Sequence, residues 1–266
     1  MKPDLQSRGV LDETAARGVY DARRVLPADD LAEHVAYFWL VRWRLDAPYE
    51  QHAITLPAAH FVFEQNDATG ARASRFAGPG RRRFTRRLEG AGHILGIALH
   101  AGTAFGWLRQ PLARFVDRLV PLRTVWKRDV AEAERTILGA RSDEAAVRAA
   151  ERLVRRWKPE PDADSRLAAR LVERTSHDRS LCRVEQLVAL SGRSERGLQR
   201  LFHRHVGVSP KAVIRRFRLV EAADALDRKK VKSLTELAHQ LGYYDQAHFV
   251  RDFKATVGRV PSALRR

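Results

Sequence analysis

The spacing of apolar residues changes along the chain, from an alternation typical of strands to the three- or four-residue spacing typical of helices. Between residues 34 and 45 apolar side chains occupy every second position, which predicts a long strand with one apolar face. That face comprises Val35, Tyr37, Trp39, Val41, Trp43 and Leu45. A short helix is predicted at 28–33, and further strands at 54–57, 60–65 and 94–100. Several short strands favour a barrel or sandwich, so we expect a β-rich domain over residues 1–120.

Beyond the β-rich part the pattern becomes helical. Helices are predicted over 125–140 and 142–157, the second beginning with a serine N-cap and two acidic residues. The run KPEPDAD at 158–164 contains two prolines and is the best linker candidate. We therefore expect an α+β multidomain chain, with residues 121–160 as a helical connector or dimerisation segment and 165–266 as an all-α domain.

The C-terminal domain contains an internal repeat. SERGLQRLFHRHVGVSP (194–210) aligns with DQAHFVRDFKATVGRVP (245–261) at an offset of 51, with five identical pairs among 17. Each copy follows a short amphipathic segment, at 184–190 and 234–241. This order of elements predicts two helix-turn-helix motifs. The run 209–230 between them has apolar residues at helical spacing, which predicts a long helix that joins the motifs.

The second helix of each copy has an apolar face and an exposed face. In the first copy Leu198 and Phe202 are expected to point inward, while Arg196, Gln199 and Arg200 point outward. Arginine can pair with guanine and glutamine with adenine in the major groove. The candidate DNA-binding residues are Ser194, Arg196, Gln199, Arg200 and His203 in the first copy and Gln246, Ala247, His248, Arg251 and Lys254 in the second. Because the two faces differ, we expect them to read different bases. A rigid helix between the motifs would place these bases about one DNA turn (~34 Å) apart.

Residues 170–266 resemble the C-terminal domain of the AraC/XylS transcription regulators. The resemblance rests on LQRLFHRHVGVSP (198–210), FRLVEAADAL (217–226) and LAHQLGYYDQAHFVRDFKATVGRVP (237–261). It implies two recognition helices in consecutive major grooves of double-stranded DNA. The base-reading positions that it implies are Arg196, Gln199 and Arg200 in the first motif and Gln246, Ala247 and Arg251 in the second.

Two departures from the family pattern lie in the second motif. Val250 stands where the family often has a small polar residue, and Tyr243-Tyr244 replaces a more usual Phe-Ser. They leave the base preference of this motif open but not its fold.

The N-terminal half is similar to an uncharacterised domain often found ahead of this DNA-binding module. The similar runs are HVAYFWLVRW (34–43), ITLPAAHFVFE (54–64), FAGP (76–79) and GIALHAGTAFGWLRQP (96–111). The resemblance implies a role in sensing or dimerisation.

A small-molecule pocket inside the β layer is one hypothesis for this domain, and a filled core is the other. The candidate ligand-binding residues are Trp39, Trp43, Phe61 and Phe63, with His60 and His100 as the polar groups. The histidines of this region have irregular spacing and no His-x-His pair, so no metal or other cofactor is expected.

Composition supports a polyanionic partner. The net charge is +17, and residues 179–266 hold 19 basic against 8 acidic residues. Only eight of the 49 basic residues are lysines, a skew that a GC-rich genome would also produce. The single cysteine, Cys182, excludes an intrachain disulfide. The uncharged run 90–108 contains five glycines and predicts a strand, a turn and a short helix rather than a membrane span.

The most consistent interpretation is a cytoplasmic, sequence-specific transcription regulator that is not an enzyme. The expected partners are double-stranded DNA, a second copy in a homodimer formed through residues 1–160, a small-molecule effector and RNA polymerase, with no membrane. A DNA-tethered repair enzyme is one alternative, against which the single cysteine argues. A non-specific architectural DNA-binding protein is another, against which the polar, unequal recognition faces argue.

Overall fold

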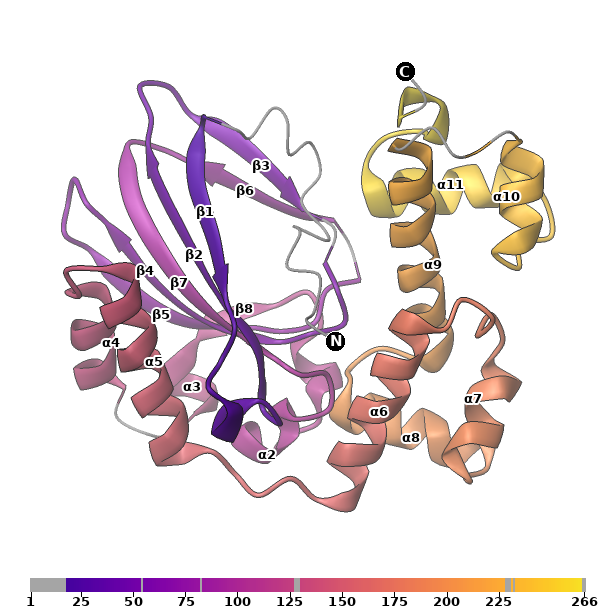
Figure 1. Ribbon diagram of the computed structural model, residues 1–266, viewed down its shortest axis with the longest axis horizontal. Helices are drawn as coiled ribbons and strands as arrows, with labels where there is room; N and C mark the ends of the chain where they lie inside the picture. Colours follow the sequence, from indigo (N-terminus) through magenta and orange to yellow (C-terminus); the bar gives the residue numbers. More distant parts are fainter. Residues whose placement is uncertain are drawn as a thin grey trace.

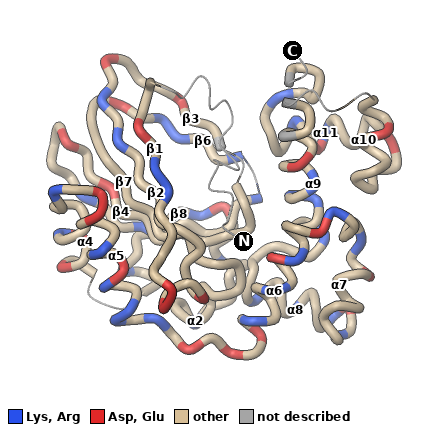
Figure 2. Tube along the Cα trace, in the orientation of Figure 1, with Lys and Arg blue, Asp and Glu red and all other residues tan. Residues whose placement is uncertain are grey.

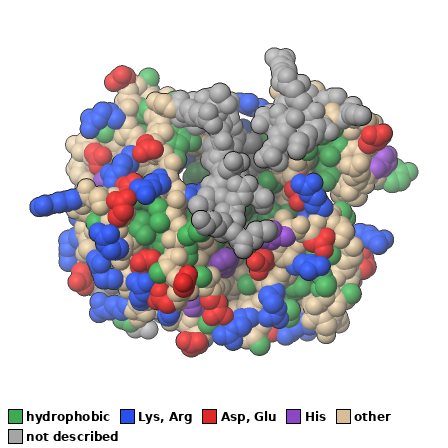
Figure 3. All heavy atoms as spheres, viewed as in Figure 1, with side chains coloured by type: hydrophobic (Ala, Val, Ile, Leu, Met, Phe, Trp, Pro, Cys, Tyr) green, Lys and Arg blue, Asp and Glu red, His purple; other side chains and the backbone are tan. Residues whose placement is uncertain are grey.

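The computed structural model describes residues 18–264, except for residues 54, 82, 127–129, 228–230 and 232. The chain forms a β-rich unit with helices on one face of its sheet, followed by a helical unit that lies beside it (Figure 1). Acidic and basic side chains are intermixed on the face of the β-rich unit seen in Figure 3.

The main sheet has six strands in the order β1-β2-β7-β4-β5-β8, and every neighbouring pair is antiparallel. Its strands are β1 (Tyr20–Val25), β2 (Val35–Arg44), β4 (His60–Asn66), β5 (Arg72–Ala77), β7 (Ala91–Leu99) and β8 (Leu119–Pro121). A second sheet pairs β3 (Tyr49–Ala53) with β6 (Phe84–Leu88). The main sheet is open, with β1 and β8 at its edges, so the expectation of a β-rich sandwich-like domain is confirmed and the barrel alternative is wrong.

Strand β2 is covered on both faces, which corrects the expectation of one apolar face. Phe38 and Leu40 belong to the large core beneath the helices. Trp39 and Trp43 belong to a smaller cluster that includes Leu88 of β6. A central strand with a layer on each side is apolar at successive positions, so its alternation does not identify the core face.

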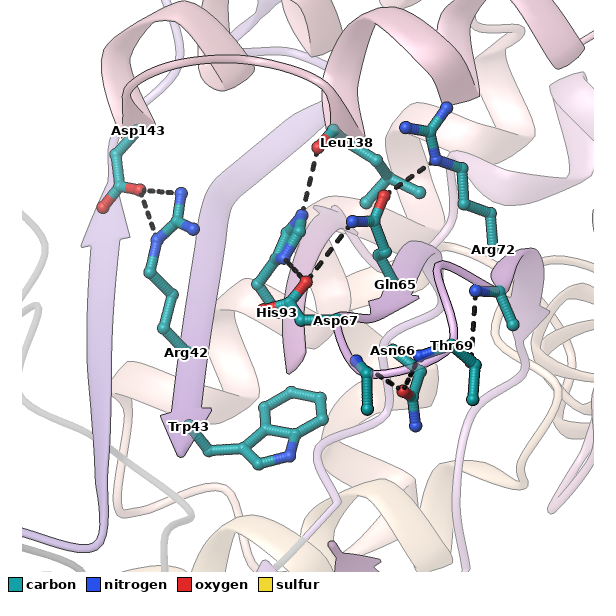
Figure 4. Close-up of polar contacts among 12 residues, drawn as sticks. Arg42, Trp43, Gln65, Asn66, Asp67, Thr69, Arg72, His93, Leu138 and Asp143 are labelled. Atoms are coloured by element: carbon teal, nitrogen blue, oxygen red, sulfur yellow. Dashed lines mark hydrogen bonds and ion pairs between the residues drawn. The ribbon is translucent and has the colours of Figure 1, made fainter. Parts of the chain in front are cut away.

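Residues 121–160 pack on the main sheet and share its large core. Their helices are α3 (Leu122–Val125), α4 (Ala131–Leu138) and α5 (Asp143–Trp157). Arg42 of β2 donates to Asp143 Oδ1 from Nε at 3.1 Å and from Nη2 at 2.9 Å, and His93 Nε2 lies 3.1 Å from the Leu138 carbonyl (Figure 4). In packing, this segment is therefore part of the N-terminal unit.

Three local predictions in the N-terminal unit differ from the structure. The helix predicted over 125–140 is divided between α3 and α4, because Trp126 is extended and packs in the core. The strand predicted at 54–57 is absent from residues 55–57, and the strand of this region is β3. The short helix predicted at 28–33 is a 3-10 turn, η1 (Asp29–Leu31).

The run 90–108 forms β7, a turn at Gly102 with φ of +98°, and the short helix α2 (Ala104–Leu108), as predicted. Within the described part of the chain, no helix has the length and apolar character needed to cross a membrane. A second 3-10 turn, η2 (Leu112–Phe115), follows α2.

The helical unit contains the two predicted motifs and the helix between them. Its helices are α6 (Ala163–His177), α7 (Val184–Ser191), α8 (Glu195–His205), α9 (Pro210–Asp227), α10 (Leu234–Gln240) and α11 (Gln246–Val257), followed by the 3-10 turn η3 (Pro261–Leu264). Each motif has its own core, and α9 contributes its first half to one and its second half to the other.

Candidate nucleic-acid interface

Helix α8 is the second helix of the first motif, and its start is fixed by local interactions. Gly192, with φ of +64°, ends α7 in the left-handed conformation. Ser194 then caps α8, because its Oγ accepts a hydrogen bond from the Gly197 N–H at 3.2 Å. Leu198 and Phe202 are fully buried, so this face of α8 is fixed against the core.

The opposite face of α8 brings together the residues predicted to read DNA. The side chains of Arg196, Gln199, Arg200 and His203 are all exposed. Gln199 donates to Glu195 one turn earlier, at 3.1 Å. Among the described residues, no carboxylate lies within ion-pair distance of Arg196 or Arg200. Both guanidinium groups therefore project from the helix without an internal counter-ion.

Helix α11 repeats this arrangement. The Asp245 carboxylate caps the helix by accepting from the His248 N–H at 2.7 Å, and Phe249 and Phe253 are fully buried. The predicted contact residues of this helix are all exposed: Gln246, Ala247, His248, Arg251 and Lys254. Gln246 accepts from the Thr235 hydroxyl at 2.8 Å, which ties the start of α11 to α10.

The second motif also presents Tyr244, which is not among the predicted contact residues. Its side chain is 90% exposed, immediately before the Asp245 cap. Val250, by contrast, packs against the second core and is half-buried. The helical spacing that identified Arg251 cannot identify Tyr244, because Tyr244 lies in the turn.

The recognition residues belong to a basic unit. Figure 2 shows Lys and Arg along the helical unit, on α6, α8 and α9. Asp252, the carboxylate on α11, is engaged by Arg215 of α9 at 3.1 Å. A positive surface around exposed hydrogen-bonding side chains suits a polyanion whose base edges must also be read.

The end of α8 is attached to the N-terminal unit. The rings of Phe105 and His205 lie 4.9 Å apart between centroids, and the Arg204 guanidinium lies 4.1 Å from the centroid of Phe105. His205 Nδ1 is 3.2 Å from the Ser165 hydroxyl of α6. The first motif is thus in direct contact with α2 of the β-rich unit.

The six residues predicted to form a ligand pocket do not converge. Phe61 and Phe63 lie in the large core, on the face of the sheet opposite to Trp39 and Trp43. Side chains alternate between the two faces of a sheet along each strand. Whether aromatic residues of two neighbouring strands lie on the same face therefore depends on the register in which the strands pair. The structure therefore does not bring these residues together on one face of the sheet, and a ligand site among them stays a prediction.

The polar groups of that proposed pocket have other partners. Trp39 Nε1 donates to His60 Nδ1 at 3.2 Å, and Trp43 Nε1 donates to the Glu89 carbonyl at 3.1 Å. Burial lowers the pKa of His60 to about 4, which leaves its imidazole neutral and able to accept from Trp39. His100 follows β7 and lies outside both clusters.

The aromatic core on the other face is closely packed. The Phe61 ring stacks on Trp126 at 5.2 Å and meets Trp107 edge-on at 5.4 Å between centroids.

Within the described residues, no group of three or more histidine, cysteine or acidic side chains is arranged to hold a metal ion.

Comparison with known proteins gives a match for each unit. Residues 187–266 match the model of a Helix-turn-helix domain, and residues 23–121 match the model of a Domain of unknown function (DUF6597). The XylDLEGF operon transcriptional activator 1 of Pseudomonas putida is 35% identical over 86 residues, which are 31% of this chain and 26% of that protein. An HTH-type transcriptional regulator of Haemophilus influenzae is 31% identical over 103 residues, which are 39% of this chain and 34% of that protein.

A solved structure of a probable AraC family transcriptional regulator from Rhodopseudomonas palustris is 30% identical to this chain. The match covers 38% of this chain and 94% of that one, with a TM-score of 0.34. The matches span only about a quarter to a third of the length of these two curated relatives. The duplicated motif and the sequence matches agree: residues 187–266 are a helix-turn-helix domain of the AraC/XylS type, the type found in transcription regulators.

Proposed function

We propose that this protein regulates transcription by binding double-stranded DNA through the exposed faces of α8 and α11. The observation that carries the proposal is that each helix has one buried apolar face and one exposed face with an arginine unpaired among the described residues. Phe202 and Phe253 are fully buried and fix one face of each helix in a core. On the opposite face, Arg200 and Arg251 have no ion pair with any described residue. Such helices can present arginine to guanine without first breaking an internal salt bridge.

The helix between the motifs supports simultaneous binding. Helix α9 has 18 residues and packs in both cores. At 1.5 Å per residue it is about 27 Å long. A separation of this order is close to one DNA turn of ~34 Å, as two successive major grooves require.

Selection of binding sites from a randomised DNA library tests this proposal. We expect the wild-type protein to enrich a bipartite site, and Arg200→Ala and Arg251→Ala each to relax the preference at a different base pair. Each variant should weaken specific binding by about 1–3 kcal/mol, roughly 5- to 150-fold. The matched control is Arg170→Ala, because Arg170 is an exposed arginine of α6 outside both motifs.

The same selection separates the alternatives. If the wild-type protein enriched no sequence, the architectural alternative would replace the proposal. If both arginine variants enriched the wild-type site with unchanged affinity, these two side chains would not read bases. A repair enzyme is not supported, because the family matched is one of regulators.

We further propose that the protein acts as a homodimer formed through residues 1–160. A second copy bound to adjacent DNA would raise the affinity through effective concentration. The sheet edge β8 carries Leu119, which is 50% exposed and available to such a contact. Sedimentation of the full chain at micromolar concentration should show a dimer, and a monomer there would contradict this part.

From this regulatory role we also propose a cytoplasmic location, RNA polymerase as a partner and control by a small molecule. An effector can regulate only if it binds the DNA-competent arrangement and the alternative arrangement with different affinities. Titration of candidate metabolites against DNA affinity would test that control.

A further inference from the structure

A small cavity of about 50 Å³ lies where the N-terminal unit meets the helical unit. Four segments that are distant in sequence surround it: the loop before β4, the turn before β6, helix α9 with the residue Val208 ahead of it, and the end of α11. The residues that line it include Arg81, Ala212, Arg215 and Arg216.

Arg216 is the central group of this cavity. Its side chain is only 8% exposed, and its Nη2 donates to the carbonyl oxygen of Arg81. Its Nη1 is buried and has no hydrogen-bond partner. Among the described residues, no carboxylate oxygen lies within 4 Å of this guanidinium. A buried cation with an unsatisfied donor is unfavourable unless an anion accompanies it.

The neighbouring carboxylates are already engaged. Asp117 accepts from the Arg81 N–H at 2.6 Å and lies 3.6 Å from Arg81 Nε. Asp252 pairs with Arg215 at 3.1 Å. Each of the two acids thus has an arginine of its own. The charge of Asp117 acts on Arg216 only from beyond ion-pair distance.

Arg216 keeps its positive charge in the folded protein despite its burial. Burial, with a smaller contribution from the charge of Arg215, lowers the pKa of Arg216 to about 10. The side chain therefore stays protonated near neutral pH and can attract an anion.

We propose that this cavity binds a small free carboxylate held by the guanidinium of Arg216. A guanidinium presents planar, paired donors that match the two oxygens of a carboxylate. A single water needs roughly 10–15 Å³ on the same measure, so the cavity has room for about three to five non-hydrogen atoms. Formate and acetate are of this size.

Occupancy would connect the two units, because the wall of the cavity includes both Arg81 of the N-terminal unit and Arg216 of α9. A carboxylate there should favour the docked arrangement and so alter the affinity for DNA. This last consequence rests on the proposed function, whereas binding of the carboxylate does not.

Thermal unfolding of the full chain without DNA, followed by tryptophan fluorescence, tests the site. Sodium formate, acetate, chloride and phosphate are titrated separately. We expect formate or acetate to raise the unfolding midpoint saturably by about 2–4 °C. Arg216→Lys keeps the charge but loses the paired donors, so it should weaken the binding about tenfold. Ala212→Leu should abolish it by filling the cavity while leaving Arg216 unchanged.

Arg170→Lys is the matched control, because this exposed arginine experiences the same ionic strength but lies outside the cavity. Its response to acetate should equal that of the wild type. A wild-type midpoint that no carboxylate moves would overturn the proposal. So would equal shifts in the wild type and in Ala212→Leu, or shifts produced by chloride or phosphate alone. Failure of the protein to bind DNA would leave these readouts unaffected.

Discussion

Replacing Gly207 by alanine would measure how firmly the first motif is docked on the N-terminal unit. Gly207 follows α8 with φ of +89°. A Cβ at this position would lie 2.8 Å from Pro79 Cγ and 3.1 Å from both the carbonyl carbon and the carbonyl oxygen of Leu112. Pro79 and Leu112 belong to the N-terminal unit, and the Leu112 backbone cannot move aside as a flexible side chain would.

Two contributions determine the expected loss. An alanine in the left-handed region costs about 1 kcal/mol relative to glycine. Forcing an extra methyl group against packed atoms costs typically about 1–3 kcal/mol. We therefore expect Gly207→Ala to lower the free energy of unfolding by about 2–4 kcal/mol.

Gly192→Ala is the matched control. Gly192 also has a positive φ, +64°, but no atom lies within 4 Å of its added Cβ. It should cost only the conformational part, about 1 kcal/mol.

Urea unfolding followed by circular dichroism of the helices would measure both variants, in the full chain and in residues 165–266 alone. The difference between the variants should be about 1–3 kcal/mol in the full chain and should vanish in the fragment, which lacks Pro79 and Leu112. Equal losses in the full chain would refute the docking of Gly207 against the N-terminal unit.

Three further predictions concern stability. Ser194→Ala or Asp245→Ala should each cost about 0.5–2 kcal/mol in urea unfolding, because an N–H at the start of α8 or α11 loses its acceptor; no change in either would exclude a capping role. Arg218 is 1% exposed and donates to the Thr175 carbonyl, so Arg218→Met should cost about 2–4 kcal/mol, and an unchanged midpoint would contradict this link between α6 and α9. The pKa of His60 is lowered to about 4, so between pH 4 and 6.5 the unfolded state binds more protons than the folded state. The free energy of unfolding should therefore fall by about 1–3 kcal/mol as the pH drops through this window. His60→Gln should remove that part of the pH dependence of stability.

The elements whose signals are local follow from the amino-acid sequence alone. The two recognition helices follow from apolar residues three and four positions apart, such as Leu198 with Phe202 and Phe249 with Phe253. Their first residues follow from Ser194 and Asp245, because a capping side chain acts within one turn of its own helix. The exposed positions of α8 and α11 follow from the same spacing. The contacts that they make with DNA remain predictions.

How the strands and the two units meet depends on contacts between residues far apart in the chain. The edge strand β1, YDARRV, carries too little alternation to be recognised, because three of its six residues are exposed and none is fully buried. The open sheet, and the separation of Phe61 from Trp39, depend on register between distant strands, which alternation within one strand does not encode. The cavity at Arg216 joins residues 135 positions apart, from Arg81 to α9. Such a site exists only once both units have folded and docked, because no local pattern brings a buried charge and a distant backbone carbonyl together.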